Sequence, residues 1–205
     1  MIIRTLPVGA LETNCYVVGC RETKQGLIID PAAEAERILA EVENLGLTVV
    51  AVVNTHGHID HILANDVIRK ATGAPLYMHA ADVEFLRHPD RVFAQWLGAP
   101  ASFAPPDRTL ADGEKVVVGR HSFAVLHTPG HTPGGISLYG EGVVFTGDTL
   151  FAQGVGRTDL PGGDWRQLVD SIQTKLFVLP DETVVYPGHG PSTTIGAERA
   201  DNPYV

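Results

Sequence analysis

One pattern recurs four times along the chain: a short apolar run typical of a β-strand is followed closely by histidine or aspartate. The runs span residues 49–53, 123–126, 142–145 and 183–186. The polar side chains that follow them are those of His56, His58, Asp60, His61, His131, Asp148 and His189. In layered α/β proteins, functional loops gather at the carboxyl ends of the strands. The pattern therefore predicts a fold in which four strand ends converge on one site.

The rest of the sequence predicts an α/β protein with two sheets, each covered by helices. Further strands are expected at residues 1–3, 14–18, 26–29, 76–78 and 115–118, and helices at 32–45, 60–71 and 164–176. Asp164 is a typical N-cap for the last of these helices. Because no repeat or long linker divides the 205 residues, we expect a single domain over residues 1–205.

Composition disfavours several classes of partner. A net charge of −9 gives no broad basic surface for nucleic acid. Two cysteines are too few for a disulfide framework or a cysteine-rich zinc site, and no apolar run approaches the ~18 residues of a membrane span. The first residues lack the basic and apolar segments of an export signal. We therefore expect a soluble, cytoplasmic protein that acts on a small molecule, with neither nucleic acid nor membrane as partner.

Nine histidines in so short a chain indicate metal binding, because imidazole is the commonest metal ligand. In an extended loop alternate side chains point the same way, so His56 and His58 can face one ion while Asp60 and His61 face another. Seven candidates exceed the needs of one ion, and none is a cysteine of the kind that closed structural zinc sites usually contain. If Asp148 bridges two ions, each gains three further ligands. These are His56, His58 and His131 for the first ion and Asp60, His61 and His189 for the second. Two divalent ions are expected, with zinc as the first choice and iron or manganese as alternatives.

The other histidines have ordinary interpretations. His79, His88 and His121 are expected at the surface or in capping positions. His127 is expected to be a hydrogen-bonded core residue, with support of the metal site as the alternative. Asp30 precedes a proline at a strand end, so it either initiates a turn or supports the metal loop from behind.

Four motifs resemble those of the metallo-β-lactamase superfamily, in the superfamily's order: NTHGHIDH, TPGHTPGG, FTGDTLF and YPGHG, which span residues 54–190. Within that superfamily, LETNCYVV, IIDP, GDTLFAQGVGRTDLPGGD and TIGAERADNPY resemble the glyoxalase II-like hydrolases, especially their short single-domain bacterial branch. The resemblance implies a four-layer αβ/βα sandwich of two mixed sheets flanked by helices, with two metal ions at one edge. It also implies the ligand assignment that the spacing predicts.

The resemblance further implies a hydrolase that cleaves a thioester, either S-lactoylglutathione-like or with a smaller acyl thiol, with a metal-bridging hydroxide as nucleophile. Asp60 and Asp148 would be its catalytic carboxylates, Asp60 by orienting the nucleophile. Arg157, in VGRTD, matches a family motif near the site and would hold a substrate carboxylate. Full-length glyoxalase II enzymes carry an added helical C-terminal region that supplies much of their glutathione pocket, so the thiol carrier is left open.

Other members of the superfamily provide alternatives. A mononuclear non-haem iron persulfide dioxygenase would use His56, His131 and Asp148, but the second set of ligands favours two ions. A flavin-linked diiron oxidase has glutamate where this chain has His58. A β-lactamase would be expected to carry an export signal, and an RNA-processing phosphodiesterase a basic surface. A closed metal-binding module would have fewer ligands.

Overall fold

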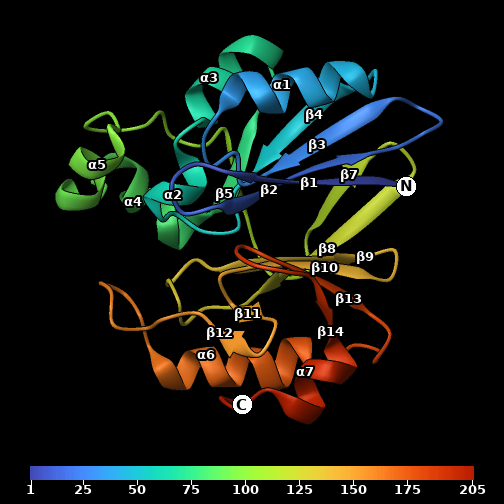
Figure 1. Ribbon diagram of the computed structural model, residues 1–205, viewed down its shortest axis with the longest axis vertical. Coiled ribbons are helices and arrows are strands. Elements are labelled where there is room, and N and C mark those ends of the chain that lie inside the picture. The colour runs from blue at the N-terminus through green and yellow to red at the C-terminus, as the bar shows by residue number, and fades with distance from the viewer.

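The computed structural model describes residues 1–205, except for the side chain of Arg91. Two six-stranded sheets pack face to face, and helices cover the outer face of each (Figure 1). This order of helix, sheet, sheet and helix is the αβ/βα sandwich that the resemblance implies, so the predicted fold class is confirmed. Among the described residues, no helix is both long and apolar enough to cross a membrane.

The first sheet is built from the N-terminal half of the chain. Its strands, in spatial order, are β1 (Ile2–Val8), β2 (Thr13–Gly19), β3 (Gln25–Ile29), β4 (Thr48–Val53), β5 (Leu76–His79) and β6 (Arg108–Leu110). β1 to β3 pair antiparallel and β3 to β6 pair parallel. Since β3, β4 and β5 run the same way, the residues that follow them come out at one edge of the sheet.

The second sheet comes from the C-terminal half. Its strands, in spatial order, are β14 (Thr193–Thr194), β13 (Val184–Pro187), β10 (Val143–Gly147), β9 (Ile136–Gly140), β8 (His121–His127) and β7 (Lys115–Val118). A separate hairpin joins β11 (Leu150–Phe151) to β12 (Gly154–Val155). β10 and β13 are parallel, which places Asp148 and His189, the residues just beyond them, at the same edge.

Alternate residues of the strands face different apolar layers. In β2, Tyr16 and Val18 lie between the sheets, whereas Val17 faces the helices α1 (Ala35–Asn44) and α3 (Asn65–Thr72). In β10, Phe145 lies between the sheets and Val144 faces α6 (Trp165–Ser171) and the π-helix η2 (Ile172–Leu176). Successive strand residues point to opposite faces, and both faces here are buried. The strands therefore read as continuous apolar runs instead of alternating ones.

Every predicted strand overlaps a strand of the structure, but the predicted helix at 32–45 begins too early. α1 starts at Ala35, because Glu34 has the left-handed backbone conformation (φ 50°, ψ 48°) that a right-handed helix cannot include. The Glu34 carboxylate accepts a hydrogen bond from the backbone N–H of Gly9 at 2.8 Å, which fixes this turn against the end of β1.

The predicted helix at 60–71 is two helices, α2 (Ile59–Ile62) and α3. At the break, the backbone N–H of Ala64 donates to the carbonyl of Pro31 at 2.9 Å. The side chain of Asn65 donates to that of Asn54 at 2.7 Å, and the Asn54 amide donates to the carbonyl of His61. Tertiary contacts thus end α2 after Ile62, although the apolar spacing continues across the break.

The third predicted helix begins as expected, with Asp164 accepting from the backbone N–H groups of Arg166 and Gln167. It changes to π geometry after Ser171. Four short helical segments were not predicted: η1 (Ala80–Asp82), α4 (Val83–Arg87), α5 (Arg91–Leu97) and α7 (Ile195–Asp201). The first three connect β5 to β6 and lie beside α2, near the edge where the strand ends meet (Figure 1).

Candidate metal centre

The loop after β4 and the loop after β8 bring three imidazoles together. His56, His58 and His131 each offer a ring nitrogen, and these nitrogens lie within 4.8 Å of one another. His58 Nδ1 and His131 Nε2 are 2.8 Å apart. His56 and His131 are buried and His58 is half-buried. We call these three residues the first trio.

A second cluster lies beside the first. Asp60, His61 and His189 also offer ligand atoms within 4.8 Å of one another. Asp60 and His61 lie on α2, which begins directly after His58, and His189 follows β13. The Asp60 carboxylate is 3.3 Å from His189 Nε2 and 3.6 Å from His61 Nε2. We call these residues the second trio.

Asp148 lies between the two trios. Its Oδ1 is 3.3 Å from His61 Nε2, and its Oδ2 is 3.6 Å from both His131 Nε2 and His189 Nε2. One carboxylate therefore faces ligand atoms of both clusters. The structure thus brings together all seven residues that the strand ends were predicted to present, in the two groups that their spacing predicts.

Groups behind four of the imidazoles hold the ring proton on Nδ1. His61 Nδ1 donates to Asp30 at 3.0 Å, His131 Nδ1 to the carbonyl of Arg157 at 2.7 Å, and His189 Nδ1 to that of Leu11 at 3.1 Å. His56 Nδ1 lies 3.1 Å from the hydroxyl oxygen of Thr55, whose own proton goes to Asp30. Each of these rings is left with a bare Nε2 that faces the centre, as in metal-binding histidines generally.

Several buried polar atoms at the centre have no hydrogen-bond partner: His56 Nε2, His61 Nε2 and Asp148 Oδ1. Buried polar atoms are nearly always satisfied, because an unpaired one costs about 1–3 kcal/mol. These three are acceptors that converge on one region. Five imidazoles with two carboxylates form a donor set that suits divalent zinc, iron or manganese. The residues present therefore fit a pair of divalent ions.

The electrostatics of the two trios differ. Burial lowers the pKa of His58 to about 3, and the neighbouring His131 adds to the effect. Burial likewise lowers the pKa of His56. For His61, burial opposes protonation, but the carboxylates of Asp148 and Asp60 outweigh it and raise the pKa. His56 and His58 therefore present neutral lone pairs, whereas a cation in the second trio competes with a proton for His61.

Asp30 supports the metal loop from behind. One of its oxygens accepts from the backbone N–H of Thr55 at 2.7 Å, and the other accepts from the Thr55 hydroxyl at 2.6 Å as well as from His61. Although Asp30 lies close enough to His56 and His61 to be grouped with them as a ligand, both of its oxygens are already occupied. This arrangement matches the supporting alternative for Asp30 and not the local turn.

Strand β2 supports the second trio, which sequence reasoning did not predict. The hydroxyl of Thr13 donates to Asp60 at 3.4 Å. The side chain of Asn14 donates to the carbonyls of Pro187 and Gly190, on either side of His189. These residues belong to LETNCYVV, a motif that carried the resemblance but no assigned chemistry.

Gly188 is required by the close approach of the chain to the centre. A Cβ at this position would collide with the carboxylate of Asp148 and lie 2.8 Å from His61 Cε1. The absence of a side chain therefore lets β13 deliver His189 directly against Asp148.

Arg157 does not extend its side chain to the trios. Its guanidinium makes two 2.7 Å hydrogen bonds to the carboxylate of Asp159, and both side chains are exposed. Its backbone carbonyl is the part that touches the centre, through His131. A role for Arg157 in holding a substrate carboxylate stays a prediction.

The remaining histidines have structural contacts elsewhere. His79 accepts from the backbone N–H of Ala81 and stacks on His127, whose Nε2 donates to the carbonyl of Pro133. His121 pairs with Glu141, and His88 is exposed. His127 is hydrogen-bonded as expected but half-buried, so it is not a fully buried core residue, and it touches the loop that carries His131. Support of the metal site by His127 stays a prediction.

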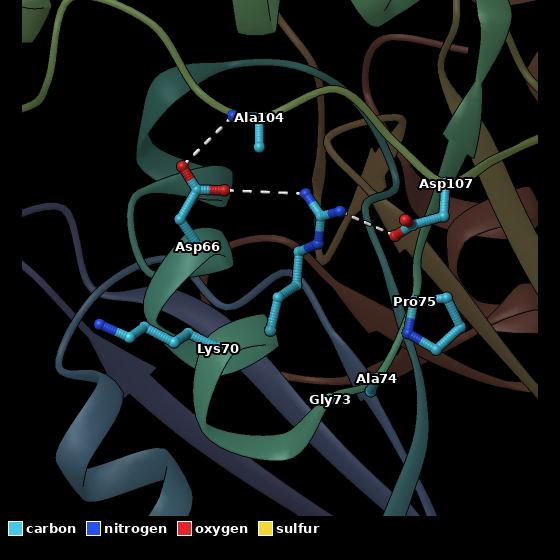
Figure 2. Close-up of a pocket in the computed structure, with 8 residues that line it drawn as sticks. Asp66, Lys70, Gly73, Ala74, Pro75, Ala104 and Asp107 are labelled. Carbon is cyan, nitrogen blue, oxygen red and sulfur yellow. Dashed lines mark hydrogen bonds and ion pairs between the residues drawn. The ribbon is translucent and has the colours of Figure 1, made fainter.

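A hollow of about 430 Å³ lies elsewhere on the surface, between α3 and the segment that leads to β6 (Figure 2). Arg69 at its centre pairs with Asp107 at 2.8 Å and with Asp66 at 3.7 Å. Because two carboxylates already surround the guanidinium, this hollow is not an anion site. None of its lining residues belongs to either trio.

The chain is similar to known proteins over nearly its whole length. The family model of the metallo-beta-lactamase superfamily matches residues 8–189. Hydroxyacylglutathione hydrolase GloC of Haemophilus influenzae is 39% identical over 209 residues, which cover 100% of this chain and 98% of that protein. The crystal structure of BLEG-1 B3 metallo-beta-lactamase superposes with a TM-score of 0.92 at 40% identity and covers 99% of both chains.

A second solved structure bears on the metal. TTHA1623, crystallised in a di-iron-bound form, superposes with a TM-score of 0.88 at 38% identity, over 98% of this chain and 100% of that one. With the family model matching most of the chain and these relatives covering nearly all of it, the protein belongs to the metallo-β-lactamase superfamily.

Proposed function

We propose that this protein is a metal-dependent hydrolase that cleaves a thioester, either S-lactoylglutathione-like or with a smaller acyl thiol. The observation that carries the proposal is the pair of trios on either side of Asp148, which offers two ions three ligands each and a shared carboxylate. The similarity to GloC supports the thioester, and the di-iron form of TTHA1623 supports two ions. Zinc is our first choice of metal, with iron or manganese as alternatives.

Two divalent ions at this site would supply a water whose pKa falls from ~15.7 toward ~7, and would polarise a substrate carbonyl. The chain's own residues supply the arrangement around that water. Asp60 is 17% exposed, and its position is fixed by Thr13 and His189. Its carboxylate is placed to accept a hydrogen bond from the attacking water and so to orient it.

The substrate reaches the centre from one side. His58, Asp60 and His189 are partly exposed, whereas the other imidazoles are buried. The ring of Phe85 packs 5.5 Å from that of His58, and the ring of Phe151 lies 6.3 Å from that of His189. Aromatic side chains flanking a polar centre suit the apolar parts of an acyl thiol.

A thioester also suits the acid–base groups of the centre. A thiol of pKa ~8.5 leaves as an anion near neutral pH, so its departure needs no dedicated proton donor. The centre therefore needs to activate and orient water, and not to protonate a basic leaving group.

The test starts with the metal content per chain and then assays the same sample in two ways. One assay follows hydrolysis of S-lactoylglutathione, and the other follows oxygen uptake with glutathione persulfide. We expect about two ions per chain and thioester cleavage. One iron per chain with oxygen uptake and no thioester cleavage would overturn the proposal in favour of the persulfide dioxygenase.

Hydrolysis of a β-lactam is a second candidate, which the similarity to BLEG-1 favours. Both reactions attack an acyl carbon, but an amine leaving group is more basic than a thiolate and requires a proton during cleavage. A chromogenic cephalosporin, assayed beside S-lactoylglutathione, distinguishes the two. A larger kcat/KM for the cephalosporin than for S-lactoylglutathione would favour β-lactam hydrolysis over thioester hydrolysis.

A further inference from the structure

Asp82 is a buried carboxylate that belongs to neither trio. It ends η1, directly before α4, and its exposure is 0%. Three neutral groups donate hydrogen bonds to its carboxylate, and His131 interacts with its charge from a longer distance. A buried carboxylate is costly unless such donors satisfy it. The hydrogen-bond partners of Asp82 therefore indicate its role.

The three donors come from two different loops. Oδ2 of Asp82 accepts from the backbone N–H of Gly57 at 2.8 Å and from the hydroxyl of Thr132 at 2.7 Å. Oδ1 accepts from the backbone N–H of Gly134 at 2.6 Å. Gly57 lies between His56 and His58, and Thr132 directly follows His131. One carboxylate thus ties the two loops that carry the first trio, one from each sheet.

The fit around Asp82 leaves little freedom. A Cβ on Gly134 would lie 2.6 Å from Asp82 Oδ1 and 2.7 Å from its backbone nitrogen, closer than side chains approach. Glycine at this position lets the loop after β8 reach the carboxylate. Three short hydrogen bonds link Asp82 to residues next to the first trio. These bonds restrict the distance between the two loops.

The second trio has supports of its own. Asp30 holds His61, Thr13 donates to Asp60, and the carbonyl of Leu11 holds His189. None of these hydrogen bonds involves Asp82. A change at Asp82 is therefore expected to act on one trio and not on the other.

We propose that Asp82 is a positioning residue for the first trio, which holds the loops of His56, His58 and His131 at the separation that binds one ion. This inference rests on the proposed two-ion centre, but not on a thioester as its substrate. It applies to metal affinity first and to activity only as a consequence.

The test measures the two zinc affinities by competition with a chromogenic chelator, in the wild-type protein and in Asp82→Asn. The amide has the shape of the carboxylate, but its NH₂ group must face at least one of the three donors. We expect the affinity of one site to fall about 10–100-fold and that of the other to stay unchanged.

Paired variants identify the affected site. In a His189→Ala background, where the second trio is incomplete, Asp82→Asn should weaken the zinc that remains. In a His58→Ala background it should leave the remaining zinc unchanged. If Asp82→Asn does not fold, Thr132→Val should weaken the same site while Thr132→Ser, which keeps the hydroxyl, retains it.

Glu198→Gln is the matched control. Glu198 is also buried and accepts from three donors, namely Gln153 N–H, the Thr193 hydroxyl and the Asn202 amide. This variant should lower thermal stability without changing either zinc affinity.

Wild-type affinities in Asp82→Asn, equal weakening of both sites, or a wild-type protein that binds no zinc would each overturn the inference. Failure of the proposed function can be distinguished from failure of this inference. A protein that binds two zinc ions without cleaving thioesters would contradict the proposed function, but the effect of Asp82→Asn on the zinc affinities could still be measured.

Discussion

The two trios differ in what supports them and in how much solvent reaches them. The first trio consists of imidazoles from loops of both sheets, and the carboxylate of Asp82 joins those loops. The second trio includes a carboxylate, and its His189 side chain is 29% exposed, compared with 5% for His131. Imidazoles alone in the first trio, and a carboxylate with the more exposed His189 in the second, would make two ion positions inequivalent.

This difference has a chemical consequence. An ion in the second trio faces the carboxylates of both Asp60 and Asp148, whereas an ion in the first trio has only Asp148 as an anionic ligand. Carboxylate ligands favour manganese, whereas imidazole ligands suit zinc and iron. Partial exchange of zinc for manganese is therefore expected to begin at the second trio.

The largest effect is expected from Asp148→Ala, because this carboxylate faces both trios. Both ions should be bound more weakly, and thioester hydrolysis should fall by at least about 10³-fold. Metal per chain and kcat/KM are the measurements. Near-wild-type rates with full metal loading would remove Asp148 from the centre.

A smaller but unequal loss is expected from removing one imidazole of each trio. His58→Ala and His189→Ala should each reduce hydrolysis by about 10²-fold or more, with His58→Ala the more severe. A water can replace the ring of His189, whose side chain is 29% exposed, more easily than the more deeply buried ring of His58. Steady-state rates at matched metal loading measure the two losses. A larger loss in His189→Ala than in His58→Ala would contradict the proposed difference between the trios.

Asp30→Asn should act directly on the second trio, through His61, and indirectly on the first trio, through Thr55 and His56. The amide has one acceptor oxygen, so it cannot accept from His61, the Thr55 hydroxyl and the Thr55 N–H together as the carboxylate does, and zinc affinity at the second trio should fall by about 10–100-fold. Chelator competition in the His58→Ala background isolates this site. Unchanged affinity there would show that Asp30 stabilises only the loop.

The smallest effect is expected from Arg157→Ala. If the guanidinium holds a substrate carboxylate, KM should rise about three- to tenfold while kcat and metal content stay constant. The neighbouring Asp159→Ala frees the guanidinium from its ion pair and provides the control. A change in metal content instead would indicate that the substitution alters metal binding through the hydrogen bond between the Arg157 carbonyl and His131.

The position of the centre could be predicted because its signals are local. Apolar strands end next to His56, His131, Asp148 and His189. Within the second sheet, β8, β10 and β13 run the same way, so the ends of these three strands meet at one edge. The same reasoning predicted the layered fold. Residue spacing was sufficient here because the ligands lie directly beyond the strands that position them.

Other features depend on contacts that the sequence does not show locally. The break between α2 and α3 comes from the bond between Asn65 and Asn54, whereas the apolar periodicity runs straight through it. Asp82 follows His-Ala-Ala at the end of the short helix η1, and its partners are 25, 50 and 52 residues away. Only the folded chain brings them together.

Neither half of the chain contains a complete trio. His56, His58, Asp60 and His61 follow a strand of the first sheet, whereas His131, Asp148 and His189 follow strands of the second. An ion can acquire all its protein ligands only after the sheets have docked, so metal loading comes late in folding. A chain cleaved between β6 and β7 would then be expected to reassemble more tightly with metal than without it.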